Sequence, residues 1–380
     1  MAERVLVAMS GGVDSAVAAG LLREQGYEVL GATMRLWPEE LCRHPAPGAR
    51  LCCSVAAVED ARRVAAHLGI RHYVLDLREV FQCTVIDPFC RDYAAGRTPN
   101  PCINCNRYVK FGALLERARQ LGARWVATGH YARVRRDDRR GRWLLLTGVD
   151  RAKDQSYTLY GMTQQQLGQT LLPVGEITKS ATRERARQWG LPVAERPESQ
   201  DICFIVDERY PEFVRRLLPQ AAAPGPVLDT AGRQIGEHQG IINYTIGQRR
   251  RLGLTTPRPR YVVAIDASRN AIVVGGPQDL FRRRLRAGGV NLIGREPWAG
   301  ELALAGKIRY NMTPQPCRAR LADTQEIVVT FTQPQRAITP GQAVVVYEGE
   351  IVVAGAVIEQ SLGEDEPEPA TTAAAGGSDG

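Results

Sequence analysis

The sequence predicts an α/β protein that begins with a doubly wound, mostly parallel sheet, followed by a small central domain and a C-terminal β-barrel-like domain. Three observations support this prediction. Strand and helix patterns alternate over the first half of the chain. A glycine-rich turn joins the first strand to the first helix. Beyond residue 226, short strands with period-2 alternation follow one another at regular turn signals.

The first strand and helix are the clearest elements. Residues 4–9 form a short apolar run that is typical of a buried strand, and residues 16–25 are an Ala/Leu-rich helical stretch closed by Gly26. The same alternation predicts strands over 28–36, 71–77 and 125–128 and helices over 54–68, 80–94 and 110–121. Ligands of such sheets bind beyond the carboxyl ends of the strands, where residues 10–15 lie.

The later part of the chain changes character. We expect an Arg-rich hairpin over 131–148 and helices over 163–169, 180–189 and 210–218, with a linker over 221–226. Strands are expected over 261–265, 271–274, 301–309, 326–331, 343–348 and 351–358. This organisation predicts domains at 1–208, 209–284 and 285–363 and a disordered acidic tail at 364–380.

Composition limits the class of protein. The 380 residues are 44% hydrophobic and 24% charged, as in an ordinary globular protein, and no apolar stretch reaches transmembrane length. The N-terminus lacks a signal-peptide layout, so a cytoplasmic protein is expected. The net charge is +8, and residues 1–363 carry +13 without the five acids of the tail. This surplus favours a polyanionic partner such as RNA or DNA.

The glycine-rich turn reads SGGVDS at residues 10–15. Gly11 and Gly12 let the backbone approach a ligand closely, while Ser10 and Ser15 supply hydroxyl donors at a helix N-terminus, where phosphate binds well. The turn has neither the Lys of the GxxxxGK[ST] loop nor the spacing of GxGxxG. The turn therefore predicts a phosphate site of a different kind.

Three of the nine cysteines stand in patterns that suggest chemistry. Cys102 and Cys105 form a CxxC ahead of a helix, and Cys203 follows much later. Together they supply three ligands, one fewer than a tetrahedral zinc site needs. An odd number of cysteines suggests metal or catalytic thiols more than a disulfide framework. The others are interpreted as structural or incidental: Cys42, Cys52, Cys53, Cys83, Cys90 and Cys317.

Six motifs in order carry a family resemblance. The SGGVDS turn resembles the SGGxDS loop of the PP-loop ATP pyrophosphatases, which adenylate a substrate oxygen. It is followed by NPCINCN at 100–106, TGHY at 128–131, KDQSY at 153–157, SQDICFI at 199–205 and GIINYTIGQRRRLG at 240–253. Together these motifs resemble the bacterial tRNA-specific 2-thiouridylase (MnmA/TrmU) family over nearly the whole chain.

The resemblance implies a set of site residues. ATP would lie against Ala8, Met9, Ser10, Gly11, Gly12, Val13, Asp14, Ser15, Met34 and Gly129. The tRNA would meet Asn100, Pro101, Cys102, His130, Lys153, Asp154, Gln155, Arg309, Tyr310 and Gln342, with the first three near the target uridine. The catalytic pair would be Cys105 and Cys203.

The resemblance also implies the reaction. The substrate would be the wobble uridine of tRNAs for Lys, Glu and Gln, with its C2 oxygen adenylated by ATP and Mg²⁺ before sulfur replaces it. In one route Cys203 carries a persulfide from a donor protein of a cysteine desulfurase relay, and Cys105 resolves it as a disulfide. Many family members carry Asp where this chain has Cys102, and three thiols also suit a [4Fe–4S] cluster that presents hydrosulfide.

Two other classes of function stay open at the level of sequence. A different PP-loop ligase or amidotransferase would explain residues 10–15 but not the three cysteines or the basic C-terminal half. An RNA-binding module with a structural zinc would fit the charge and the cysteines, and it would not split ATP.

Overall fold

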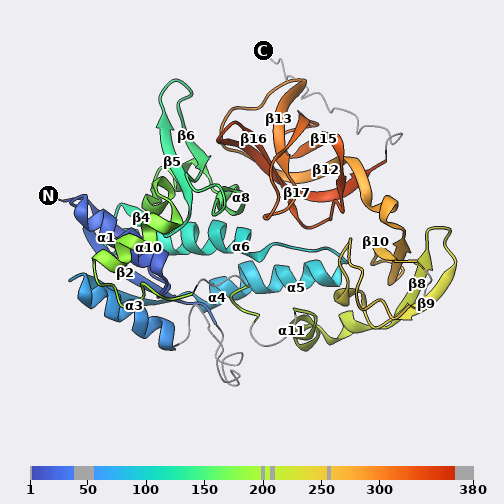
Figure 1. The fold of residues 1–380 in the computed structure, drawn as a ribbon, viewed down its shortest axis with the longest axis horizontal. Coiled ribbons are helices and arrows are strands. Elements are labelled where there is room, and N and C mark those ends of the chain that lie inside the picture. Colours follow the sequence, from blue (N-terminus) through green and yellow to red (C-terminus); the bar gives the residue numbers. More distant parts are fainter. Residues whose placement is uncertain (1, 38–54, 198–201, 206–209, 255–257, 364–380) are drawn as a thin grey trace, which may run out of the picture. The chain divides into compact units, whose positions relative to one another are not determined.

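The computed structural model describes residues 2–37, 55–197, 202–205, 210–254 and 258–363, and they form two compact units (Figure 1). The first unit comprises Met1–Phe89, Pro101–Phe213 and Glu350–Val352. The second comprises Cys90–Asn100, Val214–Gly349 and Val353–Gly380. The expected tail at 364–380 lies outside the described residues.

A five-stranded sheet forms the centre of the first unit. Its strands are β1 (Arg4–Ala8), β2 (Glu28–Arg35), β3 (Arg71–Asp76), β4 (Trp125–Ala127) and β7 (Thr170–Leu171), in the order β3-β2-β1-β4-β7. Each neighbouring pair is parallel. Central β1 is apolar almost throughout because both of its faces are covered. The predicted parallel sheet is confirmed.

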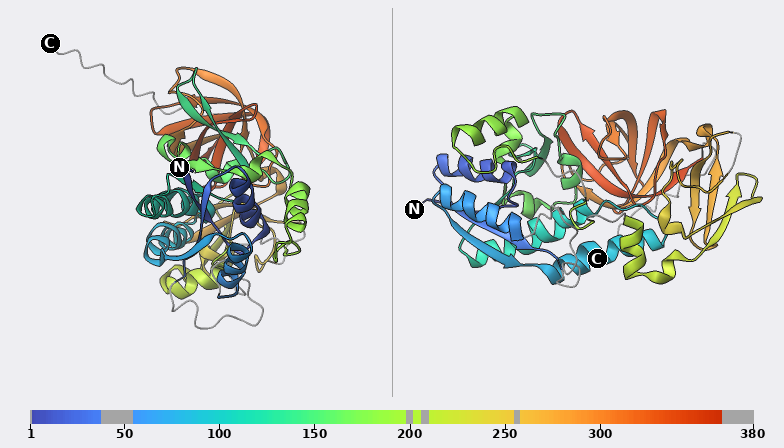
Figure 2. Two further views of the ribbon diagram at one scale, coloured as in Figure 1. Left: turned by 90° about the vertical axis from the view of Figure 1, so that its left-hand side faces the viewer. Right: turned by 60° about the horizontal axis from the view of Figure 1, so that its bottom comes forward.

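Helices cover both faces of this sheet (Figure 2). One face packs against α1 (Val13–Glu24), α3 (Val55–His67) and α10 (Lys179–Gln188), which share a core with Val5 and Val7 of β1. On the other side α7 (Leu114–Gln120) contacts β4. Helix α1 begins at Val13, earlier than residue 16, because the helix follows the glycine turn directly.

Two expected helices have different boundaries from those predicted. The helix expected over 80–94 is divided into α4 (Arg78–Phe81), the π-helix η1 (Gln82–Ile86) and α5 (Asp87–Ala94). The helix expected over 110–121 already begins at α6 (Pro101–Asn104), continues as the π-helix η2 (Cys105–Ala113) and ends as α7. A search at the period of 3.6 residues does not detect π turns, and Pro101 occupies the first helical position that proline favours.

The remainder of the first unit is a hairpin and short helices. Strands β5 (Ala132–Asp137) and β6 (Arg142–Thr147) are antiparallel, which confirms the predicted hairpin. The short elements α8 (Ser156–Leu159), α9 (Gln164–Leu167) and η3 (Pro173–Glu176) lead to α10.

The second unit contains a four-stranded sheet in the order β10-β11-β8-β9. Its strands are β8 (Gly225–Asp229), β9 (Gln234–His238), β10 (Tyr261–Asp266) and β11 (Ala271–Gly275); the short 3₁₀ helices η5 (Ile241–Asn243) and η6 (Pro277–Leu280) follow β9 and β11. Helix α11 (Tyr210–Leu217) and η4 (Pro219–Ala222) precede the sheet. The linker expected over 221–226 is wrong, because η4 and β8 occupy it and the Asn270 side chain donates to the carbonyls of Ala223 and Pro224.

A six-stranded barrel completes the second unit. It consists of β12 (Phe281–Leu292), β13 (Glu301–Lys307), β14 (Gln315–Leu321), β15 (Glu326–Arg336), β16 (Ala343–Glu348) and β17 (Ile351–Leu362). Pairing of β12 with β17 closes the barrel around a core that includes Leu285 and Phe331. The predicted barrel is confirmed, although the Arg-rich strands β12 and β14 were not expected.

Within the described part of the chain, no helix combines the length and the apolarity needed to cross a lipid bilayer.

The approach of η3 to β5 yields a test of the first unit. A Cβ at Gly175 would lie 1.8 Å from the Ala132 carbonyl oxygen, so Gly175→Ala is expected to lower the free energy of unfolding by at least about 3 kcal/mol. Gly141, at the hairpin tip, has a φ of +63° and no atom near its missing Cβ. Gly141→Ala should therefore cost only about 1 kcal/mol. Urea unfolding measures both variants, and equal costs would contradict this packing.

Candidate active site

The SGGVDS turn lies at the carboxyl edge of the sheet, between β1 and α1. Gly11 has a φ of +72°, and Gly12 is the N-cap of α1. The Ser15 hydroxyl donates to the Gly12 carbonyl at 3.1 Å and accepts the Ser10 N–H at 3.2 Å, so it holds the turn together. The first N–H groups of α1 point out of the helix end, as suits an anion.

Two other strand ends meet this turn. A Cβ on Gly129, just after β4, would lie 2.6 Å from both the Asp14 carbonyl carbon and the Ser15 nitrogen. Only glycine allows that approach. Met34 stands near the end of β2 and is half-buried, two residues beyond the level of Ala8. The structure therefore brings these predicted nucleotide residues together, while their role in binding stays a prediction.

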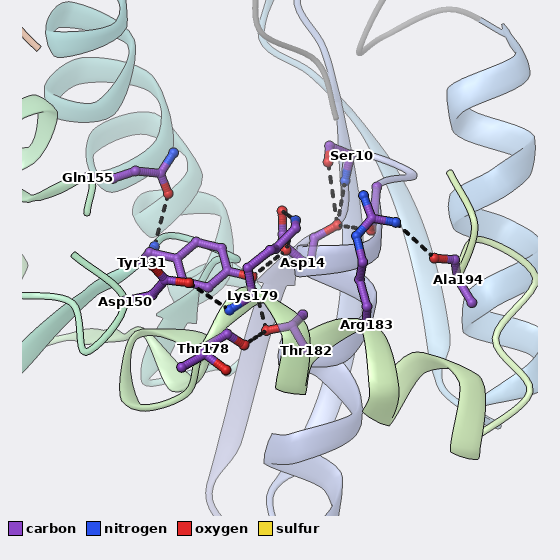
Figure 3. A network of polar contacts seen from close by, with 12 residues as sticks. Ser10, Asp14, Tyr131, Asp150, Gln155, Thr178, Lys179, Thr182, Arg183 and Ala194 are labelled. Carbon is purple, nitrogen blue, oxygen red and sulfur yellow. Dashed lines mark hydrogen bonds and ion pairs between the residues drawn. The ribbon is translucent and has the colours of Figure 1, made fainter. Parts of the chain in front are cut away.

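The Asp14 carboxylate is the centre of a polar network (Figure 3). Lys179 Nζ donates to both of its oxygens, at 2.6 and 2.8 Å, and the Tyr131 hydroxyl donates to one of them at 2.7 Å. The Tyr131 hydroxyl also lies 2.9 Å from the Thr182 hydroxyl. Because the Lys179 side chain is 9% exposed, this ion pair is poorly screened by water.

Two arginines flank the same turn. Arg196 donates to the Gly11 carbonyl at 2.7 Å and forms an ion pair with Asp60 of α3. These two contacts connect the turn to α3. Arg183, one helical turn after Lys179 on α10, points toward the Ser10 side of the turn (Figure 3). Lys179 and Arg183 thus bring positive charge to a turn whose own sequence contains no cation.

His130 connects the strand end to the helix of the CxxC. Its Nε2 lies 3.3 Å from Lys110 Nζ and its Nδ1 lies 2.6 Å from the Thr128 hydroxyl. Since an ammonium can only donate, Nε2 must accept and Nδ1 must carry the proton. Burial, followed by the charge of Lys110, lowers the pKa of His130 well below its usual value. His130 is therefore a neutral imidazole at physiological pH.

The two nearby thiols differ in exposure. Cys102 in α6 is exposed, whereas Cys105, the first residue of the π-helix η2, is buried. Long π-helical segments are rare and often mark functional sites. Lys110 belongs to the same π-helix, so its contact with His130 links the helix of both thiols to the Thr128–Tyr131 segment.

Cys203 lies in a four-residue turn between segments outside the described residues, which include the Ser199–Asp201 part of its motif. It is half-buried, and the turn is closed by a hydrogen bond from the Ile205 N–H to the Ile202 carbonyl at 3.0 Å. Cys42, Cys52 and Cys53 also lie outside the described residues. Cys83 is exposed, while Cys90 and Cys317 are buried.

The implied tRNA residues of the first unit already have partners within the protein. Gln155 accepts the Tyr131 N–H at 2.9 Å, and Asp154 accepts the N–H groups of Gly148 and Ser156, both at 3.1 Å. Lys153 stands in the same segment, and Pro101 is buried at the start of α6. These contacts fix the backbone at the site, and contact with tRNA stays a prediction.

Four other implied tRNA residues belong to the second unit. Tyr310 is 36% exposed, and Arg309 donates to the Arg336 carbonyl. Gln342 donates to the Thr98 carbonyl at 2.8 Å, and Asn100 is half-buried.

The described residues contain no group of three or more His, Cys, Asp or Glu side chains that could hold a metal ion. Cys102, Cys105 and Cys203 all belong to this described part, so their arrangement here does not fit a three-thiol cluster.

Sequence reasoning missed the cations on α10 and the hydroxyl of Tyr131. Lys179 lies 165 residues from Asp14, and local sequence patterns do not reveal a contact over such a separation. One signal was available. Lys179 is the first residue of a helix, where the helix dipole favours acidic side chains, so a buried lysine there needs a partner.

The fold and the loop together define a class: a parallel sheet with an SGGVDS turn at its carboxyl edge is a PP-loop, ATP-utilising protein. The chain matches the tRNA methyl transferase HUP domain over residues 3–207, the PRC-barrel domain of the same name over 211–276 and the aminomethyltransferase β-barrel domain over 282–358.

Curated relatives narrow the class to one family. The tRNA-specific 2-thiouridylase MnmA of Symbiobacterium thermophilum is 50% identical over 95% of this chain and 93% of its own length. That of Moorella thermoacetica is 51% identical over 93% of this chain and 99% of its own. The chain belongs to the tRNA-specific 2-thiouridylase family, a family of sulfurtransferases.

A solved 4-thiouridine synthetase–RNA complex with bound ATP is 16% identical and covers 57% of this chain and 51% of its own, with a TM-score of 0.35. A likeness at this level adds nothing to the assignment.

The pair of Lys179 and Asp14 gives a second prediction. Lys179→Met leaves a carboxylate that is 31% exposed without its cation, and the expected loss of stability is about 2 kcal/mol. The double variant Asp14→Asn/Lys179→Met should recover part of that loss. Arg187 lies on the same helix as Lys179 and forms a well-exposed ion pair with Glu195, so Arg187→Met should have a much smaller effect. Additive losses in urea unfolding would contradict the coupling.

The lowered pKa of His130 gives a third prediction. In the unfolded state this histidine has a pKa near 6.5 and takes up a proton below that pH, whereas in the folded state it stays neutral. The free energy of unfolding therefore decreases as the pH falls below about 6.5. The loss should approach about 1.4 kcal/mol per pH unit. His130→Gln should reduce this slope in urea unfolding between pH 7 and pH 5. His72, whose pKa burial also lowers, keeps its own contribution. An unchanged slope would refute the buried neutral imidazole.

Proposed function

We propose that this chain replaces the C2 oxygen of the wobble uridine in tRNAs for Lys, Glu and Gln by sulfur, at the expense of ATP. One observation carries the proposal. Within one compact unit, the phosphate-binding turn is connected to the helix of Cys102 and Cys105 through Lys110, His130 and Tyr131. A site for nucleotide and a site for thiols are therefore parts of one arrangement.

The first step would be activation of the base. The C2 oxygen of uracil is a poor leaving group. Transfer of AMP to this oxygen converts it into a good leaving group. The N–H groups of the turn, with Lys179 and Arg183, would stabilise the charge that develops on the phosphates and on the departing pyrophosphate. Asp14 would hold the Mg²⁺ of ATP, and Lys179 would then turn from Asp14 to the phosphates.

The second step would be sulfur transfer from a persulfide on Cys203. Its terminal sulfur attacks C2, the C–O bond breaks and AMP leaves. The Cys105 thiolate then attacks the Cys203 sulfur, which releases the thiocarbonyl and forms a Cys105–Cys203 disulfide. A reductant restores both thiols, and a sulfur-donor protein of a cysteine desulfurase relay restores the persulfide. The alternative, a hydrosulfide on a [4Fe–4S] cluster, has no support in the arrangement of the described thiols.

The tRNA would bind through charge and through the predicted contact residues. The net charge of residues 1–363 favours a polyanion, and the wobble base must leave the anticodon stack to meet the turn, at a cost of a few kcal/mol. We assign adenylation and thiolation to residues 1–208 and further tRNA contacts to residues 209–284 and 285–363.

A reconstituted reaction tests the function. The purified protein, unmodified transcript, ATP, Mg²⁺ and a persulfide donor should give 2-thiouridine at the wobble position, with AMP and pyrophosphate formed only when the transcript is present. Mass spectrometry of the nucleosides measures the product. Nucleotide consumption that ignores the transcript, with no thiocarbonyl, would overturn the proposal.

Cysteine variants in the same reaction separate the two sulfur routes. With a persulfide donor, Cys203→Ser should lose at least about 10³-fold in thiolation while tRNA-dependent pyrophosphate release continues, because activation of the base precedes sulfur transfer. Cys102→Ala, the matched control, removes an implied tRNA contact but no sulfur carrier, so at saturating transcript it should retain most of the thiolation rate. If Cys102→Ala instead abolishes thiolation and wild-type protein purified without oxygen contains iron and sulfide, the cluster route is correct.

A further inference from the structure

We propose that Phe204 is a positioning residue for sulfur transfer: its buried ring anchors the turn that carries Cys203 and so fixes where that sulfur can reach. This inference rests on the proposed function of Cys203. Phe204 itself touches no substrate and acts only through the preceding residue.

A buried aromatic ring anchors the turn. Residues 202–205 form one tight turn, and Cys203 and Phe204 are its two central residues. Phe204 is 2% exposed, whereas the other three side chains are half-buried. Within this described turn, the ring that lies deepest is therefore attached to the residue directly after the thiol.

Three buried phenylalanines form the socket of this ring. The ring centroids lie 5.7 Å from Phe81, 5.1 Å from Phe89 and 5.4 Å from Phe213. The first two contacts are edge-to-face, at 78° and 87°, an arrangement that aromatic pairs favour. Because each partner is at most 1% exposed, the socket fixes the orientation of the Phe204 ring as well as its depth.

The socket belongs to the same helical layer as the other thiols. Phe81 ends α4 and Phe89 lies in α5, on either side of the π-helix η1. In turn, α4 and η1 pack against η2, and η1 packs against α6. The helices that hold the Phe204 ring are thus in contact with the helices that carry Cys102 and Cys105.

The packed rings therefore hold the Cys203 sulfur in a defined position relative to the helix of Cys105, although the two cysteines are far apart in sequence. Resolution of the persulfide requires the Cys105 sulfur to attack the Cys203 sulfur, and a displacement of about 1 Å costs such a step up to about 100-fold. A turn held by one ring in a rigid socket limits that displacement. Loss of the ring should therefore slow the sulfur steps and leave nucleotide chemistry intact.

The experiment compares Phe204→Ala and Phe204→Leu with Phe331→Leu in the full-length protein. Phe331 is a buried phenylalanine of the barrel core, in the second unit, so its variant controls for a general loss of packing. Three quantities are measured: the single-turnover thiolation rate, tRNA-dependent pyrophosphate release, and the rate at which iodoacetamide alkylates Cys203, identified by peptide mass spectrometry.

Phe204→Ala should lower the thiolation rate by about 10- to 100-fold, leave tRNA-dependent pyrophosphate release within about twofold of wild type and raise the alkylation rate of Cys203 by about tenfold. Phe204→Leu, which retains an apolar side chain, should give intermediate values, and Phe331→Leu should resemble wild type in all three. If Phe204→Ala does not fold, the Leu variant carries the test. Wild-type alkylation and thiolation in both Phe204 variants would overturn the proposal.

The equilibrium between the Cys105–Cys203 disulfide and glutathione gives a readout that does not need the reaction. Two thiols are oxidised as one glutathione disulfide is reduced, so the equilibrium constant reports how well the two sulfurs are placed. Phe204→Leu should lower this constant by about tenfold, and an unchanged constant would contradict the anchor. If wild type forms no thiouridine, the proposed function fails. The disulfide equilibrium constant and the alkylation rate still decide whether Phe204 holds Cys203.

Discussion

The carboxylate of Asp14 is the point on which the first unit depends. It receives Lys179 from α10 and Tyr131 from the segment after β4, and it stands in the first turn of α1. Three segments that are distant in sequence therefore share one charge. An ion pair with a side chain as buried as Lys179 is stabilising only when both partners are held in good geometry, so the pair fixes α10 and the Tyr131 segment relative to the turn.

The same constraint places cations beside a turn that contains no lysine of its own. In the GxxxxGK[ST] loop the cation is part of the loop, whereas here α10 supplies Lys179 and Arg183 from elsewhere in the chain. The segment that contacts Asp14 also contains His130, which meets the π-helix of Cys105 through Lys110. The SGGVDS turn and the helix of the thiols are thus linked through Tyr131 and His130, which are neighbours in the chain and make one polar contact to each side.

Elements defined by local patterns were predictable. Strand β1, helix α1 and hairpin β5–β6 follow from apolar runs, period and turn residues within a few positions. The π-helices η1 and η2 were not predictable, because their wider turns depend on packing against each other and do not follow the period of 3.6 residues. Strands β12 and β14 were missed because their outward arginines hide the alternation that closure of the barrel requires.

Short motifs in the sequence were sufficient to identify the family, the glycine-rich turn and the three cysteines of interest, because the chemistry of each is carried by neighbouring residues. The folded chain alone shows three further features: the cations beside the turn, the neutral state of His130, and the buried Phe204 ring that directly follows Cys203. The physical reason is that ion pairing, desolvation and ring packing act between atoms that the fold brings within a few ångströms, whatever their separation along the chain.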